Sequence, residues 1–294
     1  MQSTAKASEC TQMIDLHTHS SASDGALTPT ALIDRAITEG LSALALTDHD
    51  SFDGLDEAQA AADAGGLRFI RGIEIEIAFE PGEFHLLGLD FSAIQEPFHE
   101  AALALARSRE DRNRAVLELF RADGVQLDYD ELRERVGLGM IGRPHIAELL
   151  VSKRVVKSKQ EAFDKYLAKG RSHYLRKACM ELKDAIDMVH GSGGLAFIAH
   201  PMSLFVSWTK MRTLFGAWKE FGIDGIEAWH PTARLVECER LDRMAREFGY
   251  RISAGSDFHG ANRPDRSLGH TTGNRPIGDE FLACLDRSLS APAP

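Results

Sequence analysis

Met13-Ile-Asp-Leu-His-Thr-His19 is the stretch from which the fold can be read, because it is a short apolar run that ends in two histidines. Similar runs recur along the chain, and most are separated by amphipathic helical patterns. Strands that alternate with helices of about 10 to 15 residues indicate a parallel sheet built from β/α units. The predicted strands are Met13–Leu16, Ser42–Leu46, Arg68–Ile77, His85–Phe91, Leu195–Ala199, Gly225–Trp229 and Arg251–Ala254.

The helical patterns between these strands have recognisable ends. Thr28 precedes Pro29, as expected of an N-cap followed by proline at the first helical position, and Gly40 falls where a C-cap belongs. Seven strands predict a closed or nearly closed α/β barrel. An open doubly wound sheet is the alternative, because periodicity alone does not decide closure. The predicted barrel helices are Pro29–Thr38, Asp53–Ala64, Leu182–His190, Trp208–Phe221 and Ala233–Phe248.

The long gap between the fourth and fifth predicted strands differs from the rest of the chain. We expect residues 97–177 to form a helical insertion or cap domain on a barrel made of residues 13–96 and 178–289, after a disordered leader at residues 1–12. From Arg143 to Lys177, ten Lys and Arg stand against three acidic residues, a surplus of +7. This basic stretch is either a solvated helical surface or a lid over an anionic substrate. Its predicted helices are Phe98–Ala122, Asp130–Arg135, Pro144–Lys153 and Lys159–Ala168.

The composition of the chain excludes several classes of protein. The formal net charge of −10 over 294 residues argues against broad, non-specific binding of nucleic acid, which needs a basic surface. No apolar run is long enough for a transmembrane helix, and the first residues lack the apolar stretch of a signal peptide. We therefore expect a cytoplasmic enzyme without a membrane partner. Free thiols in a reducing cytosol are expected at Cys10, Cys179, Cys238 and Cys284, which show no metal-binding spacing.

Residues that can bind a metal fall near the ends of one predicted strand after another. In a β/α barrel the carboxyl ends of the strands open onto one face, so these residues should meet in one pocket. Burying so many ionisable groups without a cation would cost on the order of several kcal/mol per uncompensated charge. The sequence therefore predicts a metal centre. Its candidate ligands are His17, His19, Asp24, His49, Glu74, His85, His200, Asp257 and His259.

The types of ligand narrow the choice of metal. Mixed imidazole and carboxylate ligation suits Mn²⁺, Zn²⁺ or Fe²⁺ better than Ca²⁺ or Mg²⁺, and we favour Mn²⁺. The candidates outnumber what one ion needs, so two or three divalent ions are expected. Two ions roughly 3.5–4 Å apart are the usual device for attacking a phosphate ester. Histidines outside the pattern are expected to be hydrogen-bonded structural residues: His99, His173, His190 and His270.

The same residues form motifs that resemble the polymerase and histidinol phosphatase (PHP) family. The resemblance extends from Met13 to about Gly269 and implies a distorted seven-stranded β/α barrel. The motifs are Asp15-Leu-His17-Thr-His19-Ser20 with Asp24-Gly25, Thr47-Asp48-His49, Gly72-Ile-Glu74, His85, His200-Pro201 and Ser256-Asp257-Phe-His259.

The resemblance also implies how the metals would be distributed. Glu74 would bridge two of three metal ions. The first ion would be held by His17, His19, Glu74 and Asp257, the second by Glu74, His85 and His200, and the third by Asp24, His49 and His259.

The insertion, with its Gly142-Arg143-Pro144-His145 segment, resembles one branch of the family. That branch hydrolyses 3′,5′-nucleoside bisphosphates and trims short RNA from its 5′ end. The resemblance thus implies a small anionic nucleotide or a short RNA as substrate, and no extended duplex. No feature of the sequence sets the oligomeric state.

Several further residues are candidates for substrate binding or proton transfer. Arg143 could clamp a phosphate, because its planar guanidinium matches two oxygens; it could instead be a surface residue at the start of a helix. His145 and His230 could donate a proton to the leaving oxygen or contact phosphate. Ser20 could donate a hydrogen bond to phosphate or merely stabilise a turn. A basic rim could be completed by Arg176 and Lys177.

Three other functions compete with this hypothesis. A histidinol-phosphate phosphatase would share the metal site, but a basic insertion repels a cationic amine. Amide hydrolysis is a second possibility, because the same metal chemistry can act on a carbonyl carbon. A non-catalytic metal or nucleotide sensor is the alternative from another class. Hydrolysis of a panel of phosphate esters would separate these functions.

Overall fold

A computed structural model describes residues 12–137 and 139–288. Residues 1–11 of the predicted leader and residue 289, the predicted end of the barrel, lie outside the described residues. The described residues form a seven-stranded sheet in which the strands follow one another in chain order. The strands are β1 (Met13–Thr18), β2 (Leu41–Leu46), β3 (Arg68–Ile77), β4 (Phe84–Leu89), β5 (Leu195–Ile198), β6 (Gly225–Trp229) and β7 (Arg251–Ala254).

Strand β4 runs antiparallel to both of its neighbours, β3 and β5, so the prediction of a wholly parallel sheet is wrong at this strand. Only residues 78–83 connect β3 to β4. A parallel crossover needs a dozen or more residues, so this short connection forces a hairpin. The reversal brings the amino end of β4, where His85 lies, to the rim formed by the carboxyl ends of the other strands.

The first and last strands meet beyond the end of β7. The Asp257 N–H donates to the carbonyl of His17 at 2.9 Å, and the His19 N–H donates to the carbonyl of Phe258 at 2.9 Å. Thr18 and Phe258 thereby form a parallel bridge. The sheet is thus joined into a ring at this rim, as predicted for a distorted α/β barrel. The sequential strand order also rules out the doubly wound alternative.

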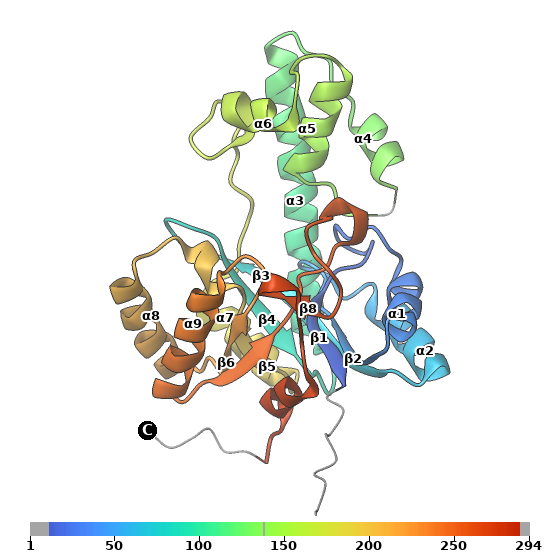
Figure 1. Cartoon of the computed structure of the whole chain (residues 1–294). Helices are drawn as coiled ribbons and strands as arrows, with labels where there is room; N and C mark the ends of the chain where they lie inside the picture. Colours follow the sequence, from blue (N-terminus) through green and yellow to red (C-terminus); the bar gives the residue numbers. More distant parts are fainter. Residues whose placement is uncertain (1–11, 138, 289–294) are drawn as a thin grey trace, which may run out of the picture.

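Helices cover the outer face of the sheet (Figure 1). The predicted start of the first helix is confirmed, because the Thr28 hydroxyl accepts a hydrogen bond from the Ala31 N–H at 3.2 Å. The predicted bounds of α1 and α8 are also confirmed, and the others differ by one or two residues. These helices are α1 (Pro29–Thr38), α2 (Leu55–Gly65), α7 (Leu182–Gly191), α8 (Trp208–Phe221) and α9 (Leu235–Glu247).

The helical segment between β4 and β5 has its own apolar core. Helix α3 (Glu96–Ala122) extends away from the sheet, and the other helices of the segment gather along its outer part (Figure 1). Val116 and Phe120 of α3 pack there against Leu149 and Ile146. The predicted helix Lys159–Ala168 is a short α-helix followed by a π-helical turn. These elements are α4 (Tyr129–Val136), α5 (Arg143–Ser152), α6 (Lys159–Ala162) and η1 (Phe163–Leu167).

Short elements complete the described part of the chain. The strand pair β8–β9 lies near β1, where the Ile14 N–H donates to the carbonyl of Ile277 at 2.9 Å. None of the helices formed by the described residues could span a membrane. The short elements are η2 (Pro201–Leu204), η3 (Gly260–Asn262), β8 (His270–Thr271), η4 (Thr272–Asn274), β9 (Arg275–Pro276) and η5 (Asp279–Leu285).

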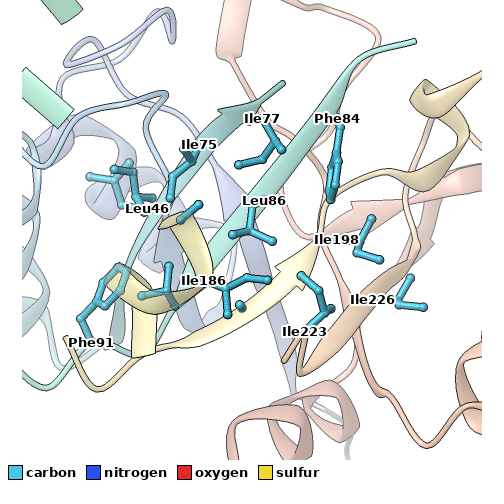
Figure 2. Close-up of a cluster of buried hydrophobic side chains, with 14 of the residues drawn as sticks. Leu46, Ile75, Ile77, Phe84, Leu86, Phe91, Ile186, Ile198, Ile223 and Ile226 are labelled. Carbon is cyan, nitrogen blue, oxygen red and sulfur yellow. The ribbon is translucent and has the colours of Figure 1, made fainter. Parts of the chain in front are cut away.

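Both faces of the sheet bury apolar side chains, as expected of strands covered by helices outside and by one another inside. On the outer face, Ile75, Leu86, Ile198 and Ile226 pack with Ile186 of α7 (Figure 2). A second cluster fills the inner face below the rim. It includes Ile14, Leu16, Ala43, Ala45, Ile70, Leu87, Leu89, Phe197 and Ala254.

Ile198→Val is expected to lower the free energy of unfolding by about 1 kcal/mol, because it removes one buried methylene from a fully buried site. Denaturant unfolding of the metal-loaded protein measures the change. Val236→Ala is the control, since Val236 is 62% exposed and should change stability by less than about 0.5 kcal/mol. Equal losses in the two variants would contradict the packing described here.

Candidate metal centre

Glu74 of β3 lies at the centre of five histidines and is fully buried. Its Oε1 lies 2.8 Å from Nδ1 of His85 and 2.7 Å from Nε2 of His200. Its Oε2 faces the ring nitrogens of three further histidines, at 3.4, 3.3 and 3.0 Å respectively: His17, His19 and His49.

Asp257, which follows β7, lies close to two of the same histidines. Its Oδ1 lies 3.3 Å from Nε2 of His19 and 3.7 Å from Nε2 of His17. The two histidine Nε2 atoms are only 3.1 Å apart. Two ring nitrogens at this distance can share at most one proton, so a cation between them and the carboxylates satisfies both.

A third set of donors surrounds Asp24 in the loop after β1. Asp24 Oδ1 lies 3.0 Å from Nε2 of His259 and 3.8 Å from Nδ1 of His19. Its Oδ2 lies 3.9 Å from Nε2 of His49. His19 and His49 therefore link this set to Glu74 and Asp257.

The structure brings all nine predicted metal ligands to one rim. Groups of ligand atoms there lie within 4.8 Å of one another, and His200 contacts the cluster through Glu74. The overlapping groups are His19–Asp24–His49–His259, His17–His19–Glu74–Asp257, His17–Glu227–His230 and His49–Glu74–His85.

The hydrogen-bond partners of three histidine rings suit the binding of a cation by the cluster. Nδ1 of His17 donates to Glu227 Oε1 at 2.9 Å, and Nδ1 of His259 donates to the carbonyl of Asp257 at 2.8 Å. Nδ1 of His200 lies 2.9 Å from the Ser203 hydroxyl, which itself donates to backbone carbonyls. Each ring therefore turns the lone pair of its Nε2 towards carboxylate oxygens, an arrangement that divalent ions stabilise.

The charge of Glu74 leads to the same conclusion. Burial pushes its pKa up, yet the surrounding histidines, His49 first, hold that pKa well below its ordinary value. Its Oε2 is buried without a hydrogen bond from the described residues, as is Nε2 of His259. A buried carboxylate in this state needs positive charge nearby. Neutral imidazole nitrogens and ionised carboxylate oxygens are a fitting donor set for divalent metal ions.

Two residues of the centre have left-handed backbone conformations. His200 has φ of 26° and Asp257 has φ of 53°. Such conformations cost about 1–3 kcal/mol each and persist where the surroundings hold them. The N–H of His200 donates to Glu227 Oε2 at 2.7 Å, and the N–H of Asp257 donates to the carbonyl of His17. The fold thus holds both residues in position for the site.

Glu227 of β6 is a site residue that the sequence reasoning missed. It is fully buried and accepts hydrogen bonds from the His17 ring and the His200 backbone. A carboxylate that orients a ligating histidine in this way fixes the tautomer of its ring. The available signal was an acidic residue in the middle of the apolar strand Gly225–Trp229.

Two further buried carboxylates hold the loops of the site in place. Asp15 accepts the backbone N–H groups of Ser256 and Gly269, at 3.0 and 2.8 Å, and burial raises its pKa to about 6. Asp48 accepts the backbone N–H and the hydroxyl of Ser20, at 2.8 and 2.6 Å. Ser20 is fully buried and its hydroxyl donates to Asp48, which favours the second of its two predicted roles, that of stabilising the turn.

His230 lies at the edge of the cluster with one nitrogen turned towards it. The backbone N–H of Thr232 donates to His230 Nδ1 at 3.1 Å, so the proton of the neutral ring is on Nε2. Burial lowers the pKa of this histidine and thereby favours the neutral form. Nε2 lies 3.5 Å from Asp257 Oδ2 and has no hydrogen-bond partner among the described residues.

Three adjoining cavities surround the cluster. The metal cavity, of about 450 Å³, lies over Glu74, His85, His200, His230 and Asp257. The arginine cavity, of about 350 Å³, contains Arg143 and shares Glu83 and Phe205 with the metal cavity. The cap cavity, of about 480 Å³, lies between the rim residues Asp24, His49 and His259 and the helices α4 and α5.

The predicted substrate contacts are divided between these cavities. His145 lines the cap cavity, where the Gly142 N–H donates to its Nδ1 at 3.0 Å. Arg176 and Lys177 line the arginine cavity with Arg143, but Arg176 lies 3.8 Å from Glu80 and Lys177 is paired with Glu76. Three further arginines that line these cavities were missed by the sequence reasoning: Arg109, Arg112 and Arg263.

The histidines predicted to be structural lie outside the cluster. His173 stacks on Phe120, with ring centroids 4.0 Å apart. Nε2 of His190 lies 2.8 Å from Asp224 Oδ2, and His270 Nδ1 donates to the carbonyl of Leu268. The ring of His99 lies against Phe52, with centroids 6.3 Å apart. Three of the four cysteines are free thiols, as predicted: Cys179, Cys238 and Cys284. The fourth, Cys10, lies outside the described residues.

Comparison with known proteins places this fold and site in one family. The PHP domain family matches residues 15–168. A 5′-3′ exoribonuclease of Haemophilus influenzae is 36% identical over 253 residues, which cover 85% of this chain and 90% of the relative. A 3′,5′-nucleoside bisphosphate phosphatase of Chromobacterium violaceum is 34% identical over 281 residues, 95% of this chain and 99% of the relative.

A solved structure agrees with the sequence comparison. A protein of Bifidobacterium adolescentis, proposed to be a metal-dependent phosphoesterase, superposes with a TM-score of 0.79 at 28% identity, covering 92% of this chain and 94% of that chain. The agreement extends over the barrel and the helical segment alike. From its motifs, its seven-stranded fold and these relatives, the chain belongs to the PHP family.

Proposed function

We propose that this metal-dependent phosphoesterase removes the 3′-phosphate from 3′,5′-nucleoside bisphosphates and also acts on short 5′-phosphorylated RNA. The observation that carries the proposal is the cluster centred on Glu74, which opens into cavities lined by arginine side chains. A bisphosphate phosphatase and an exoribonuclease among the relatives support a nucleotide substrate.

The nine rim residues would hold two or three divalent ions, with Mn²⁺ favoured over Zn²⁺ or Fe²⁺. When bound, such ions lower the pKa of a water molecule and neutralise charge on phosphate oxygens. Glu74 would bridge two of them, because its two oxygens face different histidines. The three ligand sets would be His17, His19, Glu74 and Asp257; Glu74, His85 and His200; and Asp24, His49 and His259.

The proton on Nε2 of His230 suits this residue for protonating the leaving oxygen. The ring lines the metal cavity, and the Thr232 N–H keeps the proton on Nε2, the nitrogen that lies 3.5 Å from Asp257. His145 is held in the same tautomer by the Gly142 N–H, and its Nε2 can donate to a phosphate in the cap cavity. Arg263 lines both of these cavities and can bind oxygens of the reacting phosphate.

We further propose that residues 97–177 act as a cap domain that closes the site from above. The apolar cluster around Phe120 lets this segment fold around its own core, while Arg143 and His145 face the cavities beside the rim. The substrate would therefore lie between the barrel and the basic surface of the cap. A cationic amine such as that of histidinol phosphate would be repelled there by Arg112 and Arg143, which line the arginine cavity.

Phosphate release from three substrates in the presence of Mn²⁺ tests the proposed function. Adenosine 3′,5′-bisphosphate and short 5′-phosphorylated RNA are expected to be hydrolysed with a kcat/KM well above that for histidinol phosphate. A preference for histidinol phosphate would contradict this proposal and would favour the alternative function, a histidinol-phosphate phosphatase. Binding of the bisphosphate without any phosphate release, under Mn²⁺, Zn²⁺ or Fe²⁺, would favour a nucleotide sensor.

A further inference from the structure

Arg112 of α3 is a buried cation whose charge no described residue neutralises. Its side chain lines the arginine cavity, and the residue is only 8% exposed. Its Nε has no hydrogen-bond partner, and none of the ion pairs of the described residues includes its guanidinium. A buried charge in this state is strongly unfavourable unless an opposite charge binds to it.

The neighbours of Arg112 make its environment more positive. Burial, together with the nearby guanidiniums of Arg143 and Arg109, lowers its pKa to about 10. Arg109 is neutralised by Asp50, with which it forms an ion pair. Arg143 is not neutralised in this way, since its closest carboxylate is that of the exposed Glu83, at 4.0 Å.

Arg143 is nevertheless held in a defined position. Its guanidinium lies over the ring of Tyr174, 5.2 Å from the centroid, and donates to the carbonyl of Leu167 at 3.4 Å. These contacts use one face and one N–H group, which leaves the other donors of the planar fork available. Stacking of this kind orients an arginine without cancelling its charge.

Two of the three acidic residues of the arginine cavity are neutralised by lysines, and the third, Glu83, is exposed and lies 4.0 Å from Arg143. Glu76 is paired with Lys177, and Glu80 is paired with Lys169 and lies 3.8 Å from Arg176. Five basic residues line this cavity against three acidic ones, so its net charge is positive, and Arg112 has no carboxylate partner among the described residues. An anion with several oxygens would satisfy two guanidiniums at once.

We propose that Arg112 and Arg143 form a second phosphate-binding site, which holds the phosphate of the substrate that is not hydrolysed. The arginine cavity adjoins the metal cavity through Glu83 and Phe205, so one ligand can place a phosphate in each. The exposed aromatic ring of Phe205, 74% accessible, lies where the two cavities meet. This inference rests on the proposed function, because it assigns the two phosphates of a bisphosphate to two places.

The site explains how a bisphosphate would be preferred over a monophosphate. Arg112 and Arg143 touch only the distant phosphate, so they would contribute little to a substrate that lacks it. Binding at a distance from the reacting group still raises kcat/KM, because it positions that group over the metal centre.

The test compares adenosine 3′,5′-bisphosphate with adenosine 3′-phosphate in the Mn²⁺-loaded enzyme. Arg112→Gln and Arg143→Gln are expected to lower kcat/KM for the bisphosphate about 10- to 100-fold, the scale of a hydrogen bond to a charged group. Turnover of the 3′-monophosphate should change less than about threefold. The control is Arg121→Gln, which removes an exposed arginine of the same helix that is paired with Glu118. Equal losses on both substrates, or no loss on either, would overturn the proposal.

Stability gives a second readout that a merely structural role would move in the opposite direction. If Arg112 serves a ligand, removing its unmatched charge should leave Tm unchanged or raise it without substrate. If Arg112 instead holds α3 in place, Arg112→Gln should lower Tm and the proposal fails. Metal content, measured in parallel, should not change in either variant.

Failure of the proposed function would be recognised separately. In that case the unaltered enzyme would release phosphate from neither nucleotide. Binding of adenosine 5′-phosphate, measured by titration calorimetry with Mn²⁺ present, then decides whether the phosphate site exists. An increase in Kd of about tenfold or more in Arg112→Gln and Arg143→Gln supports it, and identical affinities refute it.

Discussion

Glu74→Gln is expected to abolish phosphate release and to remove metal from the centre. The amide that replaces the carboxylate loses the negative charge that faces five histidines, and it offers one neutral carbonyl oxygen in place of two equivalent carboxylate oxygens. The loss of activity should exceed the roughly 10- to 100-fold effect that is typical of residues that only support a metal ligand. Bound metal, measured by elemental analysis after purification without chelator, should fall in parallel.

Two further variants make this result interpretable. Glu227→Gln should give the intermediate effect of about 10- to 100-fold, because Glu227 orients the ring of His17 and is not itself one of the nine predicted metal ligands. Glu118→Gln, at an exposed position on α3, should leave metal content and activity unchanged. If the Glu74 variant retained full metal content and normal turnover, the central place of Glu74 in the site would be wrong.

Removal of the metal is expected to lower Tm by roughly 10 °C as well as to eliminate turnover. A ligand present at 1,000 times its Kd stabilises the folded state by about 4 kcal/mol, and each kcal/mol shifts Tm by about 2–4 °C in a domain of this size. The chain should stay folded without metal, because the clusters around Ile198 and Phe120 contain no metal ligand. Scanning calorimetry before and after chelation measures the shift.

Adding back Mn²⁺ should restore both Tm and activity, whereas Ca²⁺, which prefers oxygen ligands throughout, should restore neither. Chelated protein that holds less than a tenth of an equivalent of metal, yet melts and turns over as before, would exclude a metal-dependent mechanism. The same titration also ranks Mn²⁺, Zn²⁺ and Fe²⁺ by the activity that each supports.

The local features of the fold were predictable because their causes are local. The start of α1 follows from the side chain of Thr28 and the fixed φ of Pro29, and both act within one turn of helix. The strand bounds follow from short apolar runs whose ends carry polar residues. The same reasoning failed at β4, because the direction of a strand depends on the length of its connection and on its partners. A buried strand has the same residue composition whether it runs parallel or antiparallel to its neighbours, so composition does not reveal its direction.

Residues that position another side chain of the site were harder to predict than the candidate metal ligands themselves. Glu227 looks in the sequence like a single carboxylate within an apolar strand, and only its contact with His17 shows what it does. Ser20 shows the converse: it stands beside the His17–His19 pair in the sequence, yet its hydroxyl is buried against Asp48. Position next to a motif does not determine which way a side chain points.

The sequence by itself determined which side chains would gather at the rim, because a β/α arrangement brings the ends of successive strands to one face whatever the details of packing. The tertiary structure alone decided that β4 is reversed and that His85 thereby reaches Glu74. It also decided that Arg112 and Arg143 share a cavity, in which Arg112 has no carboxylate partner among the described residues. These features depend on contacts between residues far apart in the chain, and no periodic pattern of a single sequence records such contacts.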